Sequence, residues 1–120
     1  MFEHIRSQFT ATFGDVNDLQ VIMAPGRVNL IGEYTDFNEG FVFPMTVDRG
    51  VYVGIRGRTD QQVRVFSSRF GELIEYQLDE FEQPDSGHWS CYVLGVVEEL
   101  RVFGLVPHGF DAVIDGNLNL

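Results

Sequence analysis

The sequence predicts an α+β fold in which a mixed, mostly antiparallel sheet is flanked by two helices. Three observations predict it. Apolar residues recur at helical spacing in two segments, and apolar and polar residues alternate in several others. Hydrophobic residues make up 44% of the 120 residues, against 22% charged residues. This composition is typical of a globular chain with a buried core and excludes a disordered one.

The first third of the chain contains a helix, a strand and a loop. Apolar residues recur at spacings of three, four and four from Phe2 to Phe13, which predicts a helix over residues 2–13. An apolar run over residues 19–23 predicts a strand. Residues 25–40 are punctuated by glycine, asparagine and proline, which predicts an irregular but structured loop.

The remainder of the chain alternates strands with one helix. Alternating segments predict three successive strands of a meander, over residues 47–55, 63–66 and 74–78. A second apolar stripe from Trp89 to Phe103 predicts a helix. Alternation over residues 110–114 predicts a last strand, after which no further element is expected to cover the sheet. The length suits a single domain over residues 1–120.

Charge and composition exclude several classes of function. All eight basic residues are arginine, and the 18 acidic residues leave a net charge of −10. The absence of lysine excludes a Walker-type phosphate loop, a Schiff-base lysine and a protein-kinase site. The acidic balance argues against nucleic acid and anionic membranes as partners. The single cysteine, the scattered histidines and the lack of a long apolar run predict no disulfide, metal motif or membrane helix. A cytoplasmic location is expected.

One segment, APGRVNLIGEYTDFNEG over residues 24–40, concentrates the polar chemistry. The carboxylates of Glu33 and Asp36 can each accept hydrogen bonds from sugar hydroxyls in a fixed geometry. The guanidinium of Arg27 suits the negative charge that builds up on a transferring phosphoryl group. The alternative interpretation is structural: Arg27 pairs with Glu33 or Asp36 only to fix a turn.

The order of these residues resembles the signature of galactokinases, which belong to the GHMP superfamily of small-molecule kinases. The similarity continues in the right order through GFVFP (residues 40–44), VRVFS (residues 63–67) and the Trp89 to Val96 segment. It covers essentially the whole chain. The resemblance implies the N-terminal, galactose-binding part of a GHMP-kinase-like fold, truncated before the phosphate-binding loop and therefore a fragment of a longer kinase.

The resemblance also implies an activity and roles for individual residues. The activity is phosphoryl transfer from ATP to the C1 hydroxyl of α-D-galactose, giving galactose 1-phosphate, with Mg²⁺ required. Arg27 is implied to bind the substrate beside that hydroxyl and to act as the catalytic residue that stabilises the transferring phosphoryl group. Glu33 and Asp36 are implied to bind sugar hydroxyls, while Tyr34 and Thr35 line the sugar site. Tyr34 stands where the family usually has histidine, which removes a titratable imidazole.

The nucleotide side of the site is implied to include Ser67, Trp89 and Tyr92. Trp89 also lies on the apolar stripe of its helix, which favours core packing as its role, because aromatic residues usually pack in the core. The family's phosphate loop, magnesium ligands and catalytic aspartate follow the strand that matches residues 110–114. Most ligands of ATP and Mg²⁺ are therefore expected beyond residue 120, with no metal ligand in this chain, and the isolated chain is expected to lack activity. A non-catalytic galactose-binding or regulatory module and an inert remnant remain the alternatives.

Overall fold

The computed structural model describes residues 1–34, 36–80, 82–106 and 108–119, and the backbone alone of Asp36. The predicted α+β class is confirmed, and both helices form where their apolar stripes predict them. The elements are α1 (Phe2–Phe13), β1 (Gln20–Ile31), the 3₁₀ helix η1 (Asp36–Asn38), β2 (Phe43–Gly57), β3 (Gln62–Ser67), β4 (Glu72–Gln77), α2 (Ser90–Val102) and β5 (Phe110–Gly116). No helix in the described part of the chain is long and apolar enough to cross a membrane.

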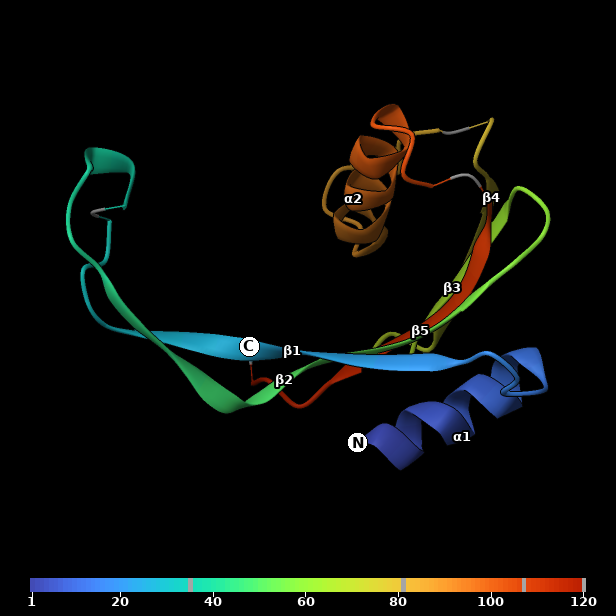
Figure 1. Ribbon diagram of the computed structural model, residues 1–120, viewed down its shortest axis with the longest axis horizontal. Coiled ribbons are helices and arrows are strands. Elements are labelled where there is room, and N and C mark those ends of the chain that lie inside the picture. The colour runs from blue at the N-terminus through green and yellow to red at the C-terminus, as the bar shows by residue number, and fades with distance from the viewer. Residues whose placement is uncertain (35, 81, 107, 120) are drawn as a thin grey trace.

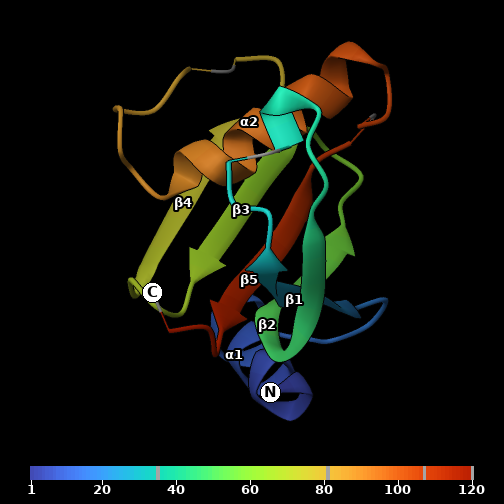
Figure 2. The same cartoon turned by 90° about the vertical axis from the view of Figure 1, so that its left-hand side faces the viewer.

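The five strands form one mixed sheet in the order β1-β2-β5-β3-β4 (Figure 2). β3 and β5 run parallel, and the other neighbours pair antiparallel. The predicted meander of β2, β3 and β4 is therefore wrong, because β5 lies between β2 and β3. The last strand is central, and not an uncovered edge. Asp111, Ala112 and Val113 are all buried, so both faces of β5 are covered.

The two helices lie on opposite faces of the sheet (Figure 1). Alternation along β5 separates the two cores, because Val113 packs on the α1 side and Ala112 on the α2 side. The buried residues of the first core are Ile5, Phe9, Leu19, Tyr52 and Val113. Those of the second core are Val63, Val65, Leu78, Val97 and Ala112. The helices are thus held by separate cores that share one sheet.

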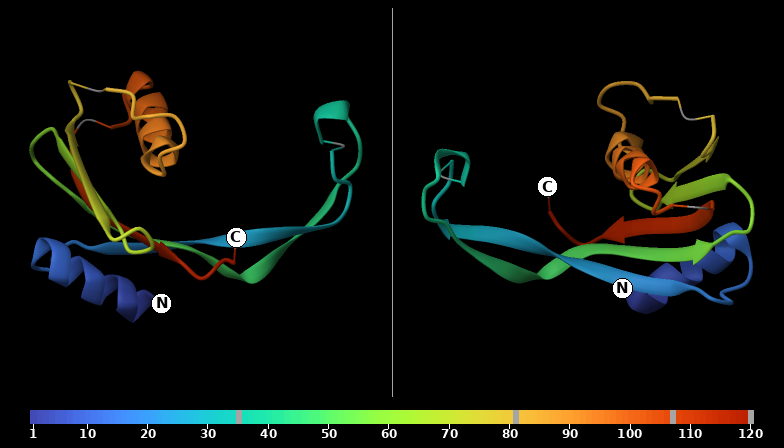
Figure 3. Two further views of the ribbon diagram at one scale, coloured as in Figure 1. Left: turned by 180° about the vertical axis from the view of Figure 1, so that it is seen from behind. Right: turned by 45° about the horizontal axis from the view of Figure 1, so that its top comes forward.

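β1 and β2 extend beyond the rest of the sheet as a long hairpin, which we call the arm (residues 25–46; Figure 3). The prediction of a loop from residue 25 is wrong up to Ile31, because this stretch pairs with β2. Pro25 is tolerated there since β1 is an edge strand, and the missing N–H breaks no ladder on its outer side. The pairing shifts register between Pro25 and Arg27 and again before Ile31. η1 lies at the tip of the arm.

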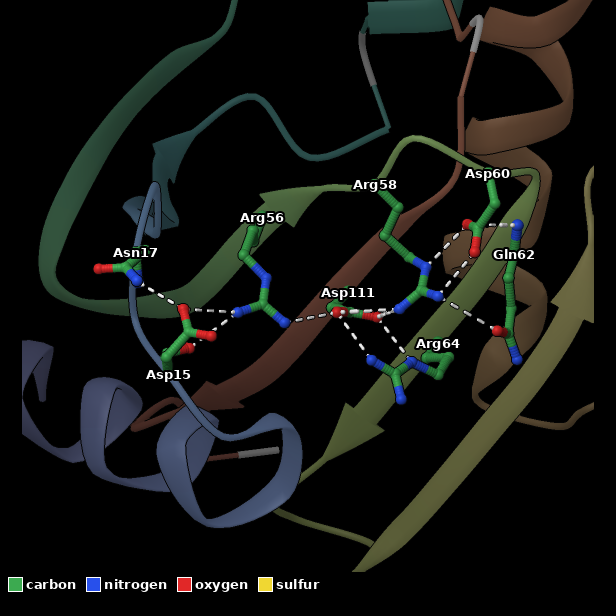
Figure 4. Close-up of polar contacts among 8 residues, drawn as sticks. All are labelled: Asp15, Asn17, Arg56, Arg58, Asp60, Gln62, Arg64 and Asp111. Carbon is green, nitrogen blue, oxygen red and sulfur yellow. Dashed lines mark hydrogen bonds and ion pairs between the residues drawn. The ribbon is translucent and has the colours of Figure 1, made fainter.

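A buried carboxylate on the α1 face joins the three central strands (Figure 4). Asp111 of β5 is 0% exposed and accepts hydrogen bonds from Arg64 of β3 (2.7 and 2.8 Å) and Arg56 of β2 (2.8 Å). Arg58 approaches it at 3.2 Å and also binds Asp60. Burial alone would raise the pKa of Asp111, but the hydrogen bonds and charges of these guanidiniums lower it below its ordinary value. The cluster ties β2, β5 and β3 together.

Candidate functional site

Arg27 lies on the arm, where β1 pairs with β2. It stands opposite Thr46, and its side chain is exposed. A shallow cavity of about 540 Å³ surrounds it, lined by Pro25, Arg27, Pro44, Met45 and Thr46. No hydrogen bond or ion pair joins Arg27 to any residue in the described part of the chain, so the alternative pairing with Glu33 is not observed. A guanidinium with its donors unused can bind an anionic or hydroxylated ligand.

The tip of the arm is shaped by residues with positive φ. Gly32 has φ 99°, and a Cβ there would lie 2.6 Å from the carbonyl oxygen of Phe41, so only glycine fits. Tyr34 follows with φ 59°. The Tyr34 ring is 78% exposed and packs edge-on against Phe37, with 6.2 Å between centroids. The Asn38 side chain donates to the Tyr34 carbonyl at 3.0 Å. The local backbone therefore presents the Tyr34 ring to solvent.

The predicted sugar-site residues are distributed along the arm. Glu33 is exposed at the tip, beside Tyr34. No hydrogen bond or ion pair joins the described side chains of Glu33 and Arg27. The extended backbone from Arg27 to Ile31 alone spans about 13 Å. Thr35 and the side chain of Asp36 lie outside the described residues. The structure thus places Arg27, Glu33 and Tyr34 on one exposed arm without bringing Arg27 into contact with the other two.

Ser67, Trp89 and Tyr92 come together at a second cavity, on the α2 face of the sheet. Ser67 ends β3 and is 4% exposed, Trp89 directly precedes α2, and Tyr92 lies in its first turn with 84% exposed. The cavity has a volume of about 350 Å³ and is predominantly apolar. It is lined by Val51, Val53, Ser67, Arg69, Phe70, Trp89, Tyr92, Val93, Ile114, Asp115, Gly116 and Leu118. Trp89 also packs against the core beneath α2, so its two suggested roles are compatible.

The segment after β5 connects the cavity to the arm. The backbone N–H of Gly50 donates to the Asn117 side chain at 2.9 Å, and the Asn117 N–H donates to the Gly50 carbonyl at 3.2 Å. This anchoring places Leu118 in the cavity lining and directly over Gly26. A Cβ on Gly26 would overlap the Leu118 side chain. The glycine that precedes Arg27 therefore makes room for a residue of the cavity wall.

Comparison with known proteins matches the same segment to one family. A family profile described as the galactokinase galactose-binding signature matches residues 7–57, which include the whole arm. The chain is 40% identical to the galactokinase of Bacillus subtilis over 98% of its own length, and 44% identical to that of Chloroflexus aurantiacus over 82%. The resemblance to galactokinases is confirmed. This galactokinase-like chain spans 31% and 25% of those two relatives.

Solved structures agree with the galactokinase-like fold. A crystal structure of Lactococcus lactis galactokinase complexed with galactose superimposes with a TM-score of 0.89 at 37% identity, covering 98% of this chain and 31% of that one. Mevalonate kinase from Methanococcus jannaschii superimposes with a TM-score of 0.70 at 17% identity, covering 84% of this chain and 33% of that one. The second match concerns the fold alone.

Several residues that line this apolar cavity were not predicted from the sequence. Val51 and Val53 come from β2, which the meander had placed away from the last strand. Phe70 comes from the β3–β4 turn, and its ring stacks on Trp89 with 6.0 Å between centroids and 11° between planes. The Ser-Ser-Arg-Phe-Gly stretch after VRVF is the signal that could have found it, since a turn that follows Ser67 must pass close to it.

The described residues include no group of three or more histidine, cysteine, aspartate or glutamate side chains arranged to hold a metal ion. The carboxylate of Asp60 is already bound by the Arg58 guanidinium. We therefore assign no residue of the described chain as a metal ligand.

Proposed function

We propose that residues 1–120 form the N-terminal galactose-binding domain of a longer galactokinase, acting in the cytoplasm. The reaction transfers the γ-phosphoryl group of ATP to the C1 hydroxyl of α-D-galactose, giving galactose 1-phosphate and ADP. The observation that carries this proposal is the galactose-binding signature over residues 7–57, which includes the arm. The galactose bound in the similar Lactococcus lactis enzyme supports galactose as the sugar.

Arg27 is proposed to act on the transferring phosphoryl group. As the C1 oxygen bonds to the γ-phosphorus, the bond to the ADP oxygen breaks, the C1 hydroxyl releases its proton to solvent or a base, and negative charge is spread over the phosphoryl oxygens. A guanidinium stays charged at any physiological pH and offers five donors, so it stabilises that charge as it develops. The exposed position of Arg27 and its unused donors in the described chain support this role. Such catalysis consists mainly of positioning and charge stabilisation.

Sugar recognition is proposed for the tip of the arm. Glu33 offers an acceptor-only carboxylate in solvent, and carboxylates discriminate between hydroxyl stereochemistries by accepting two donors at once. Tyr34 offers an exposed ring and hydroxyl beside it. Thr35 and Asp36 are assigned to the same sugar site on the family resemblance. A hydrogen bond to a charged group contributes about 1.5–3 kcal/mol, so one carboxylate accounts for a large part of a sugar's affinity.

The nucleotide is proposed to bind in the apolar cavity lined by Ser67, Trp89 and Tyr92. Its volume of about 350 Å³ and its mainly apolar walls suit a planar base with a few polar contacts. Aromatic rings stack on any base, and each such contact contributes about 1–3 kcal/mol. Mg²⁺, which the family resemblance implies, neutralises phosphate charge when it is bound. The described residues assign it no ligand.

The sugar assignment is tested by titrating the chain with D-galactose and with D-glucose in a calorimeter. Glu33→Gln is expected to weaken galactose binding by roughly 10- to 100-fold, since it removes a charged acceptor. Glu39→Gln is the matched control, because Glu39 is exposed at the same tip and the charge change is identical. Equal affinity of wild type and Glu33→Gln for galactose, or equal affinity of wild type for the two sugars, would contradict the assignment.

The nucleotide assignment is tested with adenosine, which carries the base without phosphates. Tyr92→Ala is expected to weaken adenosine binding by about 1–3 kcal/mol. Phe103→Ala is the control, since Phe103 is an exposed aromatic residue directly after α2 that does not line the cavity. Unchanged binding in Tyr92→Ala would remove that residue from the site. Galactose binding without ADP production would favour a non-catalytic module, and loss of cooperative unfolding would favour an inert remnant.

A further inference from the structure

Trp89 is held from two sides by the β3–β4 turn and the start of β4. Its indole N–H donates to the Glu72 carboxylate, with 2.7 Å from Nε1 to Oε2. Its ring face lies nearly parallel to that of Phe70. The turn between Ser67 and Glu72 closes with Gly71 at φ 62°, whose N–H donates to the Ser67 carbonyl at 2.8 Å. A tight turn therefore places a stacking ring and a hydrogen-bond acceptor at fixed positions around one indole.

A second donor converges on the same carboxylate oxygen. The His88 Nε2 atom lies 3.2 Å from Oε2 of Glu72. The backbone N–H of Ser90 donates to Nδ1 of His88 at 3.3 Å, and Oγ of the buried Ser90 lies 2.6 Å from the same atom. A backbone N–H can only donate, so with Nδ1 as its acceptor, Nε2 is the ring atom left to donate to the Glu72 carboxylate. His88 thus donates to Glu72, and Ser90 fixes the orientation of the imidazole.

The position of Glu72 at the strand end explains why this carboxylate is suited to the task. Glu72 is the ladder partner of Ser67, which lines the apolar cavity, so the backbone of Glu72 lies next to the cavity. Its side chain is 46% exposed and accepts a hydrogen bond from the indole N–H of Trp89. The ring nitrogens of Trp89 and His88 thus share one oxygen of Glu72. Loss of the Glu72 carboxylate would remove this acceptor from both rings.

We propose that Glu72 is a positioning residue that clamps the indole of Trp89 as a flat wall of the apolar cavity, preorganised for a planar aromatic base. The ligand part of this inference rests on the proposed nucleotide site, whereas the clamp itself is a property of the unliganded chain. Preorganisation saves the cost of ordering a side chain on binding. Glu72 touches no ligand in this arrangement and acts through Trp89.

The clamp is tested through Trp89 fluorescence, because Trp89 is the only tryptophan of the chain. Excitation at the red edge of indole absorption avoids the tyrosines. Glu72→Met keeps the length of the side chain and removes the acceptor, while Glu72→Gln keeps one acceptor oxygen. Glu75→Met is the matched control, since Glu75 lies exposed on the same strand and pairs with Arg64, away from Trp89. Steady-state anisotropy and acrylamide quenching are measured without ligand, with far-UV circular dichroism as the check of folding.

In Glu72→Met we expect lower anisotropy and stronger quenching than in wild type, with Glu72→Gln and Glu75→Met close to wild type. Anisotropy and quenching unchanged in Glu72→Met, or changed equally in Glu75→Met, would overturn the clamp. Glu72→Ala is the second acceptor-free variant if Glu72→Met does not fold. For adenosine we expect binding about tenfold weaker in Glu72→Met, equivalent to about 1.4 kcal/mol. Failure of the wild type to bind adenosine would refute the nucleotide site, while the fluorescence results would still decide the clamp.

Discussion

Asp111→Asn is the substitution that most directly tests what holds the sheet together. The change is nearly isosteric, but it removes the negative charge from a fully buried position that three guanidiniums share. An amide has only one acceptor oxygen. Its NH₂ group would place donors against the arginine side chains, which have no hydrogen-bond acceptor. The variant therefore leaves Arg56, Arg58 and Arg64 close together without a counter-charge on β5.

The expected loss follows from the geometry of the cluster. Removing one partner of a buried ion pair costs about 3–5 kcal/mol, because the remaining charge is left uncompensated. The three guanidiniums are 17–25% exposed and can turn partly toward water, which favours the lower end of that range. The Cζ atoms of Arg56 and Arg64 also lie 5.0 and 4.8 Å from the ring centroids of Phe9 and Phe13, respectively. These cation–π contacts oppose movement of the two guanidiniums into solvent. We expect about 3 kcal/mol, or a melting temperature lower by about 10 °C.

The assay is urea unfolding at neutral pH, followed in parallel by circular dichroism and Trp89 fluorescence. Asp60→Asn is the control, because Asp60 binds the same Arg58 at 2.7 Å from a half-exposed position. Its loss is expected to be much smaller, since an exposed pair is screened by solvent. A loss below about 1 kcal/mol in Asp111→Asn, or equal losses in the two variants, would refute the reasoning, because either result would mean that burial adds nothing to the pair.

Two further outcomes follow from the same structure. The pKa of Asp111 is lowered in the folded chain, so its contribution to stability is complete above the unfolded pKa of about 3.9 and is lost as pH falls through the folded value. Unfolding curves below pH 4 should therefore show the difference between wild type and Asp111→Asn shrinking, and a constant difference would be inconsistent with this linkage. Gly54→Ala should destabilise by about 1–3 kcal/mol, because its Cβ would lie 2.6 Å from Cγ2 of Ile5 under α1. A Cβ at Gly57 on the same strand would lie more than 4 Å from every described residue beyond its chain neighbours, so Gly57→Ala is expected to melt near wild type. Equal melting of the two variants would exclude the steric explanation.

Both helices and part of each strand could be predicted because their patterns are local. The apolar stripe of α1 and the alternation of β3 need only neighbouring residues to be recognised. The place of β5 in the sheet could not be predicted in this way. A strand buried on both faces normally has a continuous apolar run, and Asp111 interrupts it. That carboxylate is tolerated in the centre of the sheet because Arg56 of β2 and Arg64 of β3 donate hydrogen bonds to it. These contacts join residues far apart in the sequence, so no local pattern predicts them.

The candidate site was predicted unevenly for a related reason. The polar residues of the arm form one continuous segment, so Arg27, Glu33 and Tyr34 could be singled out from their order. The strand that carries Arg27 was mistaken for a loop, because Pro25 and the glycines around it are typical of turns. In the structure, Pro25 lies on an edge strand, and Gly26 and Gly32 allow neighbouring parts of the chain to approach the backbone closely. The apolar cavity draws its walls from four separate segments, and only the family resemblance connected Ser67 with the start of α2.

β2 relates the two proposed binding regions to each other. Thr46 faces Arg27 across the arm, and Val51 lines the apolar cavity five residues later, which corresponds to about 16 Å of extended strand. Leu118 contacts both regions, since it packs over Gly26 of the arm and also lines the cavity. The separation between the Arg27 guanidinium and the proposed base site is therefore set by hydrogen-bonded strands and not by loops. Phosphoryl transfer depends on holding two substrates in line. A hydrogen-bonded sheet that fixes the distance between the two proposed binding regions would support such positioning.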